Sequence, residues 1–392
     1  MDFSFTEEEE RFRERVRAFL RANLPERLRE EGGRQPGEIP RRKFLREWQK
    51  KLHENGFVGM SWPREYGGQG ATQVEQAIFN EEMARFRAPS PLNPVGMNLV
   101  GPTLMAHGTE AQKARFIPKI LPAEEIWCQL FSEPNAGSDL ASLRTRAELR
   151  GDEFIVNGQK VWSSFAHYAD WGILLARTDP EAPKHRGISY LLVDMKTPGI
   201  TVKPLRQITG EADFNEVFFE DVRVPRENLV GRLNDGWRVA VTTLSNERGT
   251  MAFALAARYE IIFNEVAELC RKVGAASSPA ARQQIAQFYI DLQSLKYSLY
   301  RNFSKILHGG TPGPEGSIAK LWWSELDQRM EEFAVQILGP AGQLMEGSKY
   351  ALDGGRWPMG LLRARCLTIA AGTSEIHRNT IAERILGMPK GR

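Results

Sequence analysis

The sequence predicts an α+β protein in which a helical N-terminal region, a central region of short β-strands and a helical C-terminal region follow one another. Amphipathic helical segments occupy the residues up to about 125, and short apolar runs separated by turn residues occupy the next stretch. The helical period returns at about Gly236 and continues to the end. This segregation disfavours a doubly wound α/β sheet. We therefore expect three domains, over 1–125, 126–235 and 236–392.

The first helix is predicted from its cap and its apolar face. Thr6 can accept a hydrogen bond from the first turn, and Glu9, three residues later, completes a capping box. Apolar residues then recur on one helical face: Phe12, Val16, Phe19 and Leu20. Pro25 marks the end of the helix, and glycine-rich turns such as 67–70 separate the helical segments that follow.

The central region carries strand and turn signals. Asn157 and Gly158, between two apolar runs, predict a hairpin turn. The run 188–193 predicts a buried strand, 198–199 a turn, and 216–219 a further strand. Several short strands at this spacing predict a small barrel or sandwich.

The C-terminal region is predicted to hold four helices. Their approximate ranges are 237–273, 280–308, 316–338 and 372–386. Serine, proline and glycine residues separate them at three breaks: 277–279, 309–314 and 339–340.

Composition excludes several classes of protein. Fifty-two basic and 49 acidic residues are mixed along the chain, so nothing indicates nucleic-acid binding. The cysteines Cys128, Cys270 and Cys366 lie far apart without a CxxC pair, and the six histidines are scattered, so no metal site is expected. No stretch is apolar enough to span a bilayer, and the N-terminus lacks the pattern of a signal peptide. We expect a cytoplasmic protein.

Two short motifs are set aside as catalytic signatures. The glycine pair at 68 and 70 lacks the third glycine of a dinucleotide-binding fingerprint and follows no clear strand. Ser138 has Ala136 and Leu140 at the positions where a nucleophile elbow needs glycine. A Rossmann site and a serine hydrolase are therefore disfavoured.

Four separated segments resemble the acyl-CoA dehydrogenase family. They are FSEPNAGSDLAS at 131–142, NGQKVWSS at 157–164, FEDVRVP at 219–225 and AGTSEI at 371–376. Their order and separations match the family, and together they span nearly the whole chain. The resemblance implies a helical N-terminal domain, a central β domain and a C-terminal four-helix bundle, with FAD between the last two. It also implies a homo-oligomer, usually a tetramer built as a dimer of dimers.

The resemblance further assigns residues to the cofactor. The residues that match contacts to the flavin ring are Phe131, Ser132, Trp162 and Ser164. Those that match contacts to the FAD phosphates or adenosine are Thr373 and Glu375, with Gln283, Gln336 and Gly339 approaching from a neighbouring subunit. An aromatic ring at position 162 would stack against the flavin and exclude water.

The position of the catalytic base departs from the commonest family pattern. Many members carry a glutamate where this sequence has Ala371, preceded by Ala370. Alanine cannot accept a proton, but its backbone N–H can still bind the thioester carbonyl. A second branch of the family carries the base on a bundle helix directly before an arginine, and Glu247 with Arg248 matches it. We expect Glu247 to be the base, with Arg248, Ser138 and Ala370 near the substrate.

The implied activity is the FAD-dependent conversion of an acyl-CoA thioester to its trans-2-enoyl form, as in the β-oxidation of fatty acids, with an electron-transferring flavoprotein as acceptor. The two alanines leave room for a long or branched acyl chain. Two alternatives remain open. One is a catalytically impaired flavoprotein subunit that partners an active homologue, and the other is an acyl-CoA oxidase or flavin monooxygenase of the same fold.

Overall fold

The structure is a computed structural model that describes residues 5–25, 38–245, 252–310 and 313–390, with the backbone alone for 38–41. The chain divides by packing into two compact units. The helical unit comprises Met1–Gly33, Gln73–Ala88 and Arg248–Arg392, and the sheet unit comprises Arg34–Thr72 and Pro89–Glu247. The domain ranges 1–125, 126–235 and 236–392 remain predictions.

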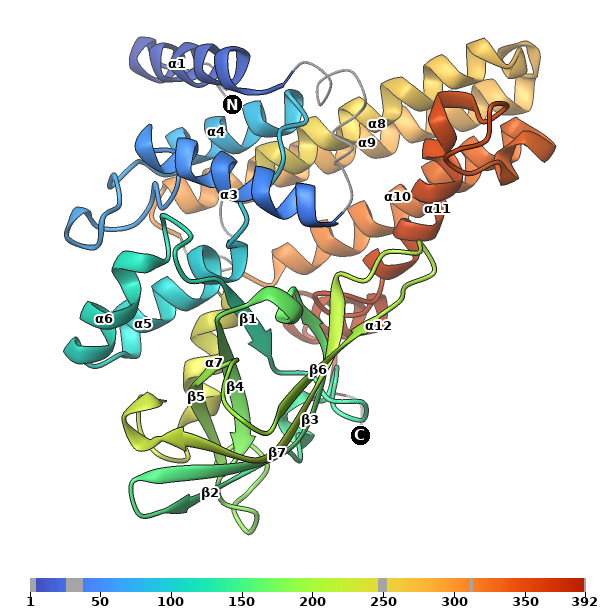
Figure 1. The fold of residues 1–392 in the computed structure, drawn as a ribbon. Coiled ribbons are helices and arrows are strands. Elements are labelled where there is room, and N and C mark those ends of the chain that lie inside the picture. Colours follow the sequence, from blue (N-terminus) through green and yellow to red (C-terminus); the bar gives the residue numbers. More distant parts are fainter. Residues whose placement is uncertain (1–4, 26–37, 246–251, 311–312, 391–392) are drawn as a thin grey trace. The chain divides into compact units, whose positions relative to one another are not determined.

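Long helices build the helical unit (Figure 1). Its α-helices are α1 (Glu7–Asn23), α4 (Gln73–Arg85), α8 (Ala252–Lys272), α9 (Pro279–Leu307), α10 (Glu315–Leu338), α11 (Arg356–Leu367) and α12 (Ser374–Arg384). Helices α8, α9 and α10 pack around one hydrophobic core. Among the largest side chains in that core are Tyr259, Phe288, Leu295, Met330 and Trp357.

The predicted cap and apolar face of α1 are confirmed. The Thr6 hydroxyl accepts a hydrogen bond from the Glu9 N–H at 3.3 Å, and the Glu9 carboxylate accepts one from the Thr6 N–H at 2.8 Å. The four predicted apolar residues are all buried. On the same helix, Arg17 donates two 2.9 Å hydrogen bonds to Glu82 of α4. Packing and paired charges thus hold α1 to the rest of the helical unit.

One eight-stranded sheet forms the centre of the sheet unit. Its strands are β1 (Trp127–Leu130), β2 (Arg146–Arg150), β3 (Glu153–Ser164), β4 (Trp171–Arg177), β5 (Ile188–Asp194), β6 (Ile200–Leu205), β7 (Phe214–Pro225) and β8 (Leu229–Val230). The order is β6-β7-β3-β2-β4-β5-β8, with β1 parallel to β4. The α-helices of this unit are α3 (Glu38–Glu54), α5 (Gly101–His107), α6 (Glu110–Phe116) and α7 (Gly236–Ser245). The expected segregation of helices and strands is confirmed.

The hairpin predicted at Asn157 and Gly158 is wrong, because β3 runs straight through both residues. The hairpin that joins β2 to β3 turns at 151–152 instead. Asn157 exchanges two 2.9 Å hydrogen bonds with Asp221 on β7. At Gly158 a Cβ atom would lie 2.7 Å from the Cα of Thr145, so only glycine allows β3 to pass this close to the residue before β2. Asn157 and Gly158 therefore pair with β7, which lies some sixty residues later in the chain, and do not form a turn.

Most other predicted elements are confirmed. The buried run 188–193 is β5, and 216–219 lies within β7. The four predicted C-terminal ranges correspond to α7 with α8, to α9, to α10 and to α12 within the described residues. Helix α11 was missed.

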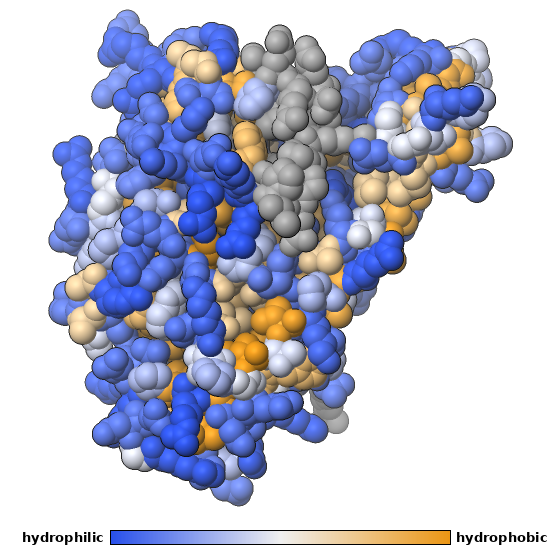
Figure 2. Space-filling model, in the orientation of Figure 1, coloured by the Kyte–Doolittle hydropathy of each residue, from blue (hydrophilic) through white to orange (hydrophobic). Residues whose placement is uncertain are grey.

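Hydrophilic residues cover most of the face drawn in Figure 2, with smaller hydrophobic areas between them. Among the residues that the structure describes, every helix is too short or too polar to cross a bilayer.

Candidate active site

The segment after β1, in the sheet unit, carries the first group of candidate site residues. Phe131 is buried edge-on against Tyr190, with 5.9 Å between ring centroids. The carbonyl of Ser132 accepts a 2.9 Å hydrogen bond from the N–H of Val161 on β3, and its side chain is half-buried. This bond fixes the segment against the strand that carries the other predicted flavin contacts. Ser138 lies farther along and is exposed.

A buried ion pair reinforces this attachment. The Lys160 ammonium, which has no exposed surface, donates to Glu133 Oε1 at 2.8 Å and to the Phe131 carbonyl at 3.0 Å. Burial lowers the pKa of Lys160 to about 8, although the adjacent carboxylate opposes the change. Burial alone would raise the pKa of Glu133, but Lys160 and the N–H groups of Arg144 and Thr145 outweigh it and lower that pKa. Both groups are therefore charged at neutral pH.

Trp162 is placed by an irregularity in β3. The register with β7 shifts between Lys160 and Ser163, and Trp162 adopts a left-handed φ of +59° within that bulge. Bulges redirect side chains, and this ring remains 61% exposed. Ser164, half-buried, pairs with Phe214, whose ring meets Trp162 edge-on. A large exposed aromatic beside two half-buried hydroxyl side chains fits the flat, polar-edged ring of a flavin.

The turn between α11 and α12, in the helical unit, carries a second group of candidate site residues. Ala371 is exposed and has a left-handed φ of +54°, which costs a non-glycine residue about 1 kcal/mol. The N–H of Ala370, just before it, bonds to the carbonyl of Cys366 at 2.9 Å. Within the described residues, the N–H of Ala371 has no hydrogen-bond partner. It is therefore a donor available to a ligand. Non-glycine left-handed residues cluster at functional sites, and both Trp162 and Ala371 are candidate site residues.

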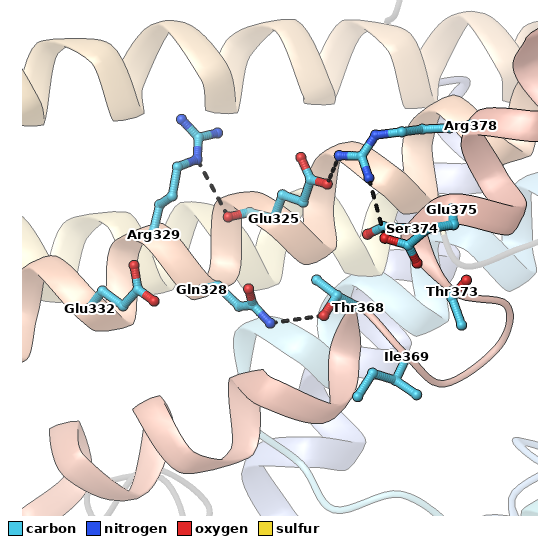
Figure 3. A pocket seen from close by; sticks show the side chains of 10 residues that line it. All are labelled: Glu325, Gln328, Arg329, Glu332, Thr368, Ile369, Thr373, Ser374, Glu375 and Arg378. Carbon is cyan, nitrogen blue, oxygen red and sulfur yellow. Dashed lines mark hydrogen bonds and ion pairs between the residues drawn. The ribbon is translucent and has the colours of Figure 1, made fainter.

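A pocket of about 480 Å³ lies beside this turn. Figure 3 shows that its walls are α10 on one side and the start of α12 with the preceding turn on the other. The residues from α10 are Glu325, Gln328, Arg329 and Glu332, and the others are Thr368, Ile369, Thr373, Ser374, Glu375 and Arg378. Two predicted site residues, Thr373 and Glu375, are thus brought together.

The polar groups of the pocket position the start of α12. The Thr373 hydroxyl caps the helix by accepting a 3.2 Å hydrogen bond from the Ile376 N–H. The backbone N–H of Glu375 and the Thr373 hydroxyl lower the pKa of the Glu375 carboxyl. Arg378 forms ion pairs with Glu325 and, at 3.8 Å, with Glu375. With three carboxylates against two guanidinium groups, the pocket lining carries a net negative formal charge, which favours hydrogen-bond donors such as hydroxyl and amino groups over a bare phosphate.

Sequence reasoning missed the α10 wall of the pocket. Glu325, Gln328 and Glu332 are spaced three and four residues apart, so they share one helical face. That pattern is common on solvated helices and carries no site signal by itself.

The remaining predicted site residues divide into two groups. Gln283, Gln336 and Gly339 are exposed and do not line the pocket beside α12. Their assignment to a site shared with a second subunit stays a prediction. Glu247 and Arg248, the expected base and its neighbour, lie outside the described residues.

Comparisons with known proteins show where the whole chain belongs. Family models for the acyl-CoA dehydrogenase N-terminal, middle and C-terminal domains match residues 6–124, 128–222 and 234–386. The chain is 40% identical to the acyl-CoA dehydrogenase IpdE1 of Mycobacterium tuberculosis over 97% of its own length and 98% of that protein.

Two solved structures extend this similarity to the fold. The Tcur3481-Tcur3483 steroid ACAD is 33% identical with a TM-score of 0.88, and the ChsE4-ChsE5 complex from Mycobacterium tuberculosis is 32% identical with a TM-score of 0.85. Each alignment covers 100% of both chains. Members of this family bind FAD. The chain belongs to the acyl-CoA dehydrogenase family and is an acyl-CoA dehydrogenase, an oxidoreductase that acts on CH–CH groups.

Proposed function

We propose that this enzyme removes a proton from Cα and a hydride from Cβ of an acyl-CoA thioester, giving the trans-2-enoyl thioester. Bound FAD supplies the hydride acceptor. Glu247 takes the α-proton, and the N–H of Ala371 donates to the thioester carbonyl oxygen as negative charge develops there. Phe131, Ser132, Trp162 and Ser164 would hold the flavin ring, and Thr373 and Glu375 would hold the rest of the cofactor.

The geometry of the Ala371 turn carries this proposal. The position that holds the base in many relatives has no carboxylate here, but alanine at this position is exposed and its backbone donor has no partner among the residues that the structure describes. Carbonyl binding and proton removal are therefore supplied by different segments of the chain. The nearby carboxylate of Glu375 is a poor base because its pKa is lowered, and Arg378 lies close to it. Glu247, which the sequence places directly before Arg248, remains the preferred base.

The proposal is tested by mixing the FAD-loaded protein with acyl-CoA thioesters without oxygen and following flavin absorbance. Loss of the oxidised-flavin band, together with formation of a 2-enoyl thioester, is the expected result. No loss with any thioester would instead favour a catalytically impaired subunit. Rapid formation of hydrogen peroxide in air would favour an oxidase over an enzyme that passes electrons to an electron-transferring flavoprotein.

We further propose a bulky acyl group, such as one bearing a fused-ring system. Ala370 and Ala371 are small and exposed, and one solved relative is described as a steroid ACAD. A panel of straight-chain, branched and ring-bearing thioesters tests the proposal. Higher kcat/KM for the ring-bearing members is expected, and turnover confined to short straight chains would contradict it.

Assembly has two candidate forms. The family resemblance favours four copies of this chain, whereas the solved ChsE4-ChsE5 relative is a complex of two different chains. The similarity to that complex favours assembly with a homologous partner chain. In that assembly, Gln336 and Gly339 lie at a cofactor site to which the partner chain also contributes residues. Native mass measurement of the chain expressed alone, and then with a homologous chain, separates these forms. Free cysteines at Cys128, Cys270 and Cys366 support a cytoplasmic location.

A further inference from the structure

Lys320 is a buried lysine that the proposed chemistry does not use. It lies on α10, is only 8% exposed, and its ammonium donates 2.8 Å hydrogen bonds to the carbonyls of Leu367 and Gly372. One carbonyl is at the end of α11 and the other directly follows Ala371. The Lys320 ammonium therefore bridges the two ends of the turn between α11 and α12 by hydrogen bonds.

A buried lysine is energetically unfavourable at this position if its contact is purely structural. Burial disfavours the charged ammonium and lowers the pKa of Lys320. Its two hydrogen-bond acceptors are neutral carbonyls, so no carboxylate in contact compensates the charge. The ring of Trp323 lies 5.9 Å away and adds only a weak cation–π attraction. An apolar side chain would pack there without this cost, which indicates that the two hydrogen bonds serve the turn.

His377 completes the restraint from the other side. Its Nε2 lies 3.1 Å from the carbonyl oxygen of Ala371. Because a carbonyl can only accept, this nitrogen must carry the hydrogen. A Cβ on Gly372 would lie 2.9 Å from the same nitrogen, so glycine at 372 lets the imidazole close over the turn. The carbonyls of Ala371 and Gly372 are thus both engaged, from α12 and from α10.

These contacts determine where the N–H of Ala371 can point. A left-handed alanine is not held by its own preference, because the left-handed conformation is unfavourable for it. The peptide plane that carries the Ala371 N–H lies between two held groups, the Ala370 N–H bound to Cys366 and the Ala371 carbonyl bound to His377. Lys320 holds the carbonyls of Leu367 and Gly372 outside these two groups, so the plane between them has little freedom. Its N–H is left without a partner in the described part of the chain. Donors that stabilise an oxyanion act only when they are fixed before the reaction.

We propose that Lys320 is a positioning residue that holds the Ala371 N–H in the orientation that binds the thioester carbonyl. The assignment rests on the proposed function, since it concerns the same carbonyl contact. Lys320 itself touches neither substrate nor cofactor and acts through the turn.

The test compares two ligands that differ only at the carbonyl. One is a 2-enoyl-CoA thioester, and the other is the matching thioether, in which a CH₂ group replaces the carbonyl. Binding to the FAD-loaded enzyme is measured calorimetrically, so no turnover is required. We expect the wild-type enzyme to prefer the thioester by about 5- to 10-fold, the value of one hydrogen bond. In Lys320→Met that preference should fall below about twofold, while thioether affinity and FAD content stay unchanged.

Matched controls separate positioning from general stability. Lys296→Met removes a partly buried lysine from α9, which pairs with Glu260, and should leave the thioester preference unchanged. Lys320→Gln keeps an uncharged NH₂ group on a shorter side chain and should give an intermediate preference. This variant also provides the test if Lys320→Met does not fold. Equal loss of thioester and thioether affinity, or an unchanged preference in both Lys320 variants, would overturn the assignment.

Failure of the proposal can be distinguished from failure of the proposed function. If the wild-type enzyme binds thioester and thioether equally, the Ala371 carbonyl contact itself is wrong. If the wild-type preference exists and persists in the Lys320 variants, the contact stands and only the role of Lys320 is refuted.

Discussion

Replacing Lys160 by methionine tests how much the buried ion pair between Lys160 and Glu133 contributes to the free energy of unfolding. Methionine keeps most of the volume of the lysine but removes the ammonium that donates to Glu133 and to the Phe131 carbonyl. Of its partners in the described part of the chain, Glu133, which is 8% exposed, then keeps the N–H groups of Arg144 and Thr145. Loss of one partner from a buried pair costs about 3–5 kcal/mol of unfolding free energy.

Urea unfolding followed by circular dichroism near neutral pH measures this change. The matched control is the double variant Lys160→Met with Glu133→Gln. Its amide oxygen can still accept one of the two N–H groups, which donate to different carboxylate oxygens in the wild type, and the side chain carries no charge. We therefore expect the double variant to recover part of the loss. A single variant within about 1 kcal/mol of the wild type, or a double variant as unstable as the single one, would refute this account of the pair.

Two further predictions follow from burial and exposure. Burial raises the pKa of Glu331 to about 7 although Arg356 donates to both of its oxygens, so the folded chain retains a proton that the unfolded chain releases near pH 4.5. The free energy of unfolding should therefore fall by up to about 3 kcal/mol as pH rises from 4.5 to above 7. The Glu331→Gln variant should show a smaller fall, and urea midpoints measured across this pH range test both expectations. Trp162→Ala should weaken FAD binding by about tenfold, measured by flavin fluorescence, but change stability by less than about 0.5 kcal/mol because the ring is exposed. A flat wild-type pH profile would contradict the first prediction, and unchanged FAD affinity would contradict the second.

The elements predicted correctly from sequence are those whose signals are local. Helix α1 has its cap and its apolar face within fifteen residues, from Thr6 to Leu20. Strand β5 is a continuous apolar run, and the sheet buries nearly all of it. Helix α11 was missed because Gly354 and Gly355 precede it and Pro358 lies within it. Proline is tolerated there because it occupies the first turn.

The candidate site shows the same division between local and distant contacts. Trp162, Thr373 and Ala371 were found through short motifs. Lys320 was not found, because its role depends on the packing of α10 against a turn some fifty residues later. The bulge that redirects Trp162 likewise arises from pairing between β3 and β7, which no local pattern predicts.

The central claim is that proton removal and carbonyl binding come from different segments, with Glu247 as the base. The direct measurement is the rate of flavin absorbance loss in a stopped-flow instrument, without oxygen, for Glu247→Gln and for a control, Glu268→Gln, on an exposed position of α8. We predict that Glu247→Gln binds FAD and thioester normally but loses flavin absorbance about 10²- to 10⁴-fold more slowly, while the control matches the wild type. A near-normal rate in Glu247→Gln would contradict the account.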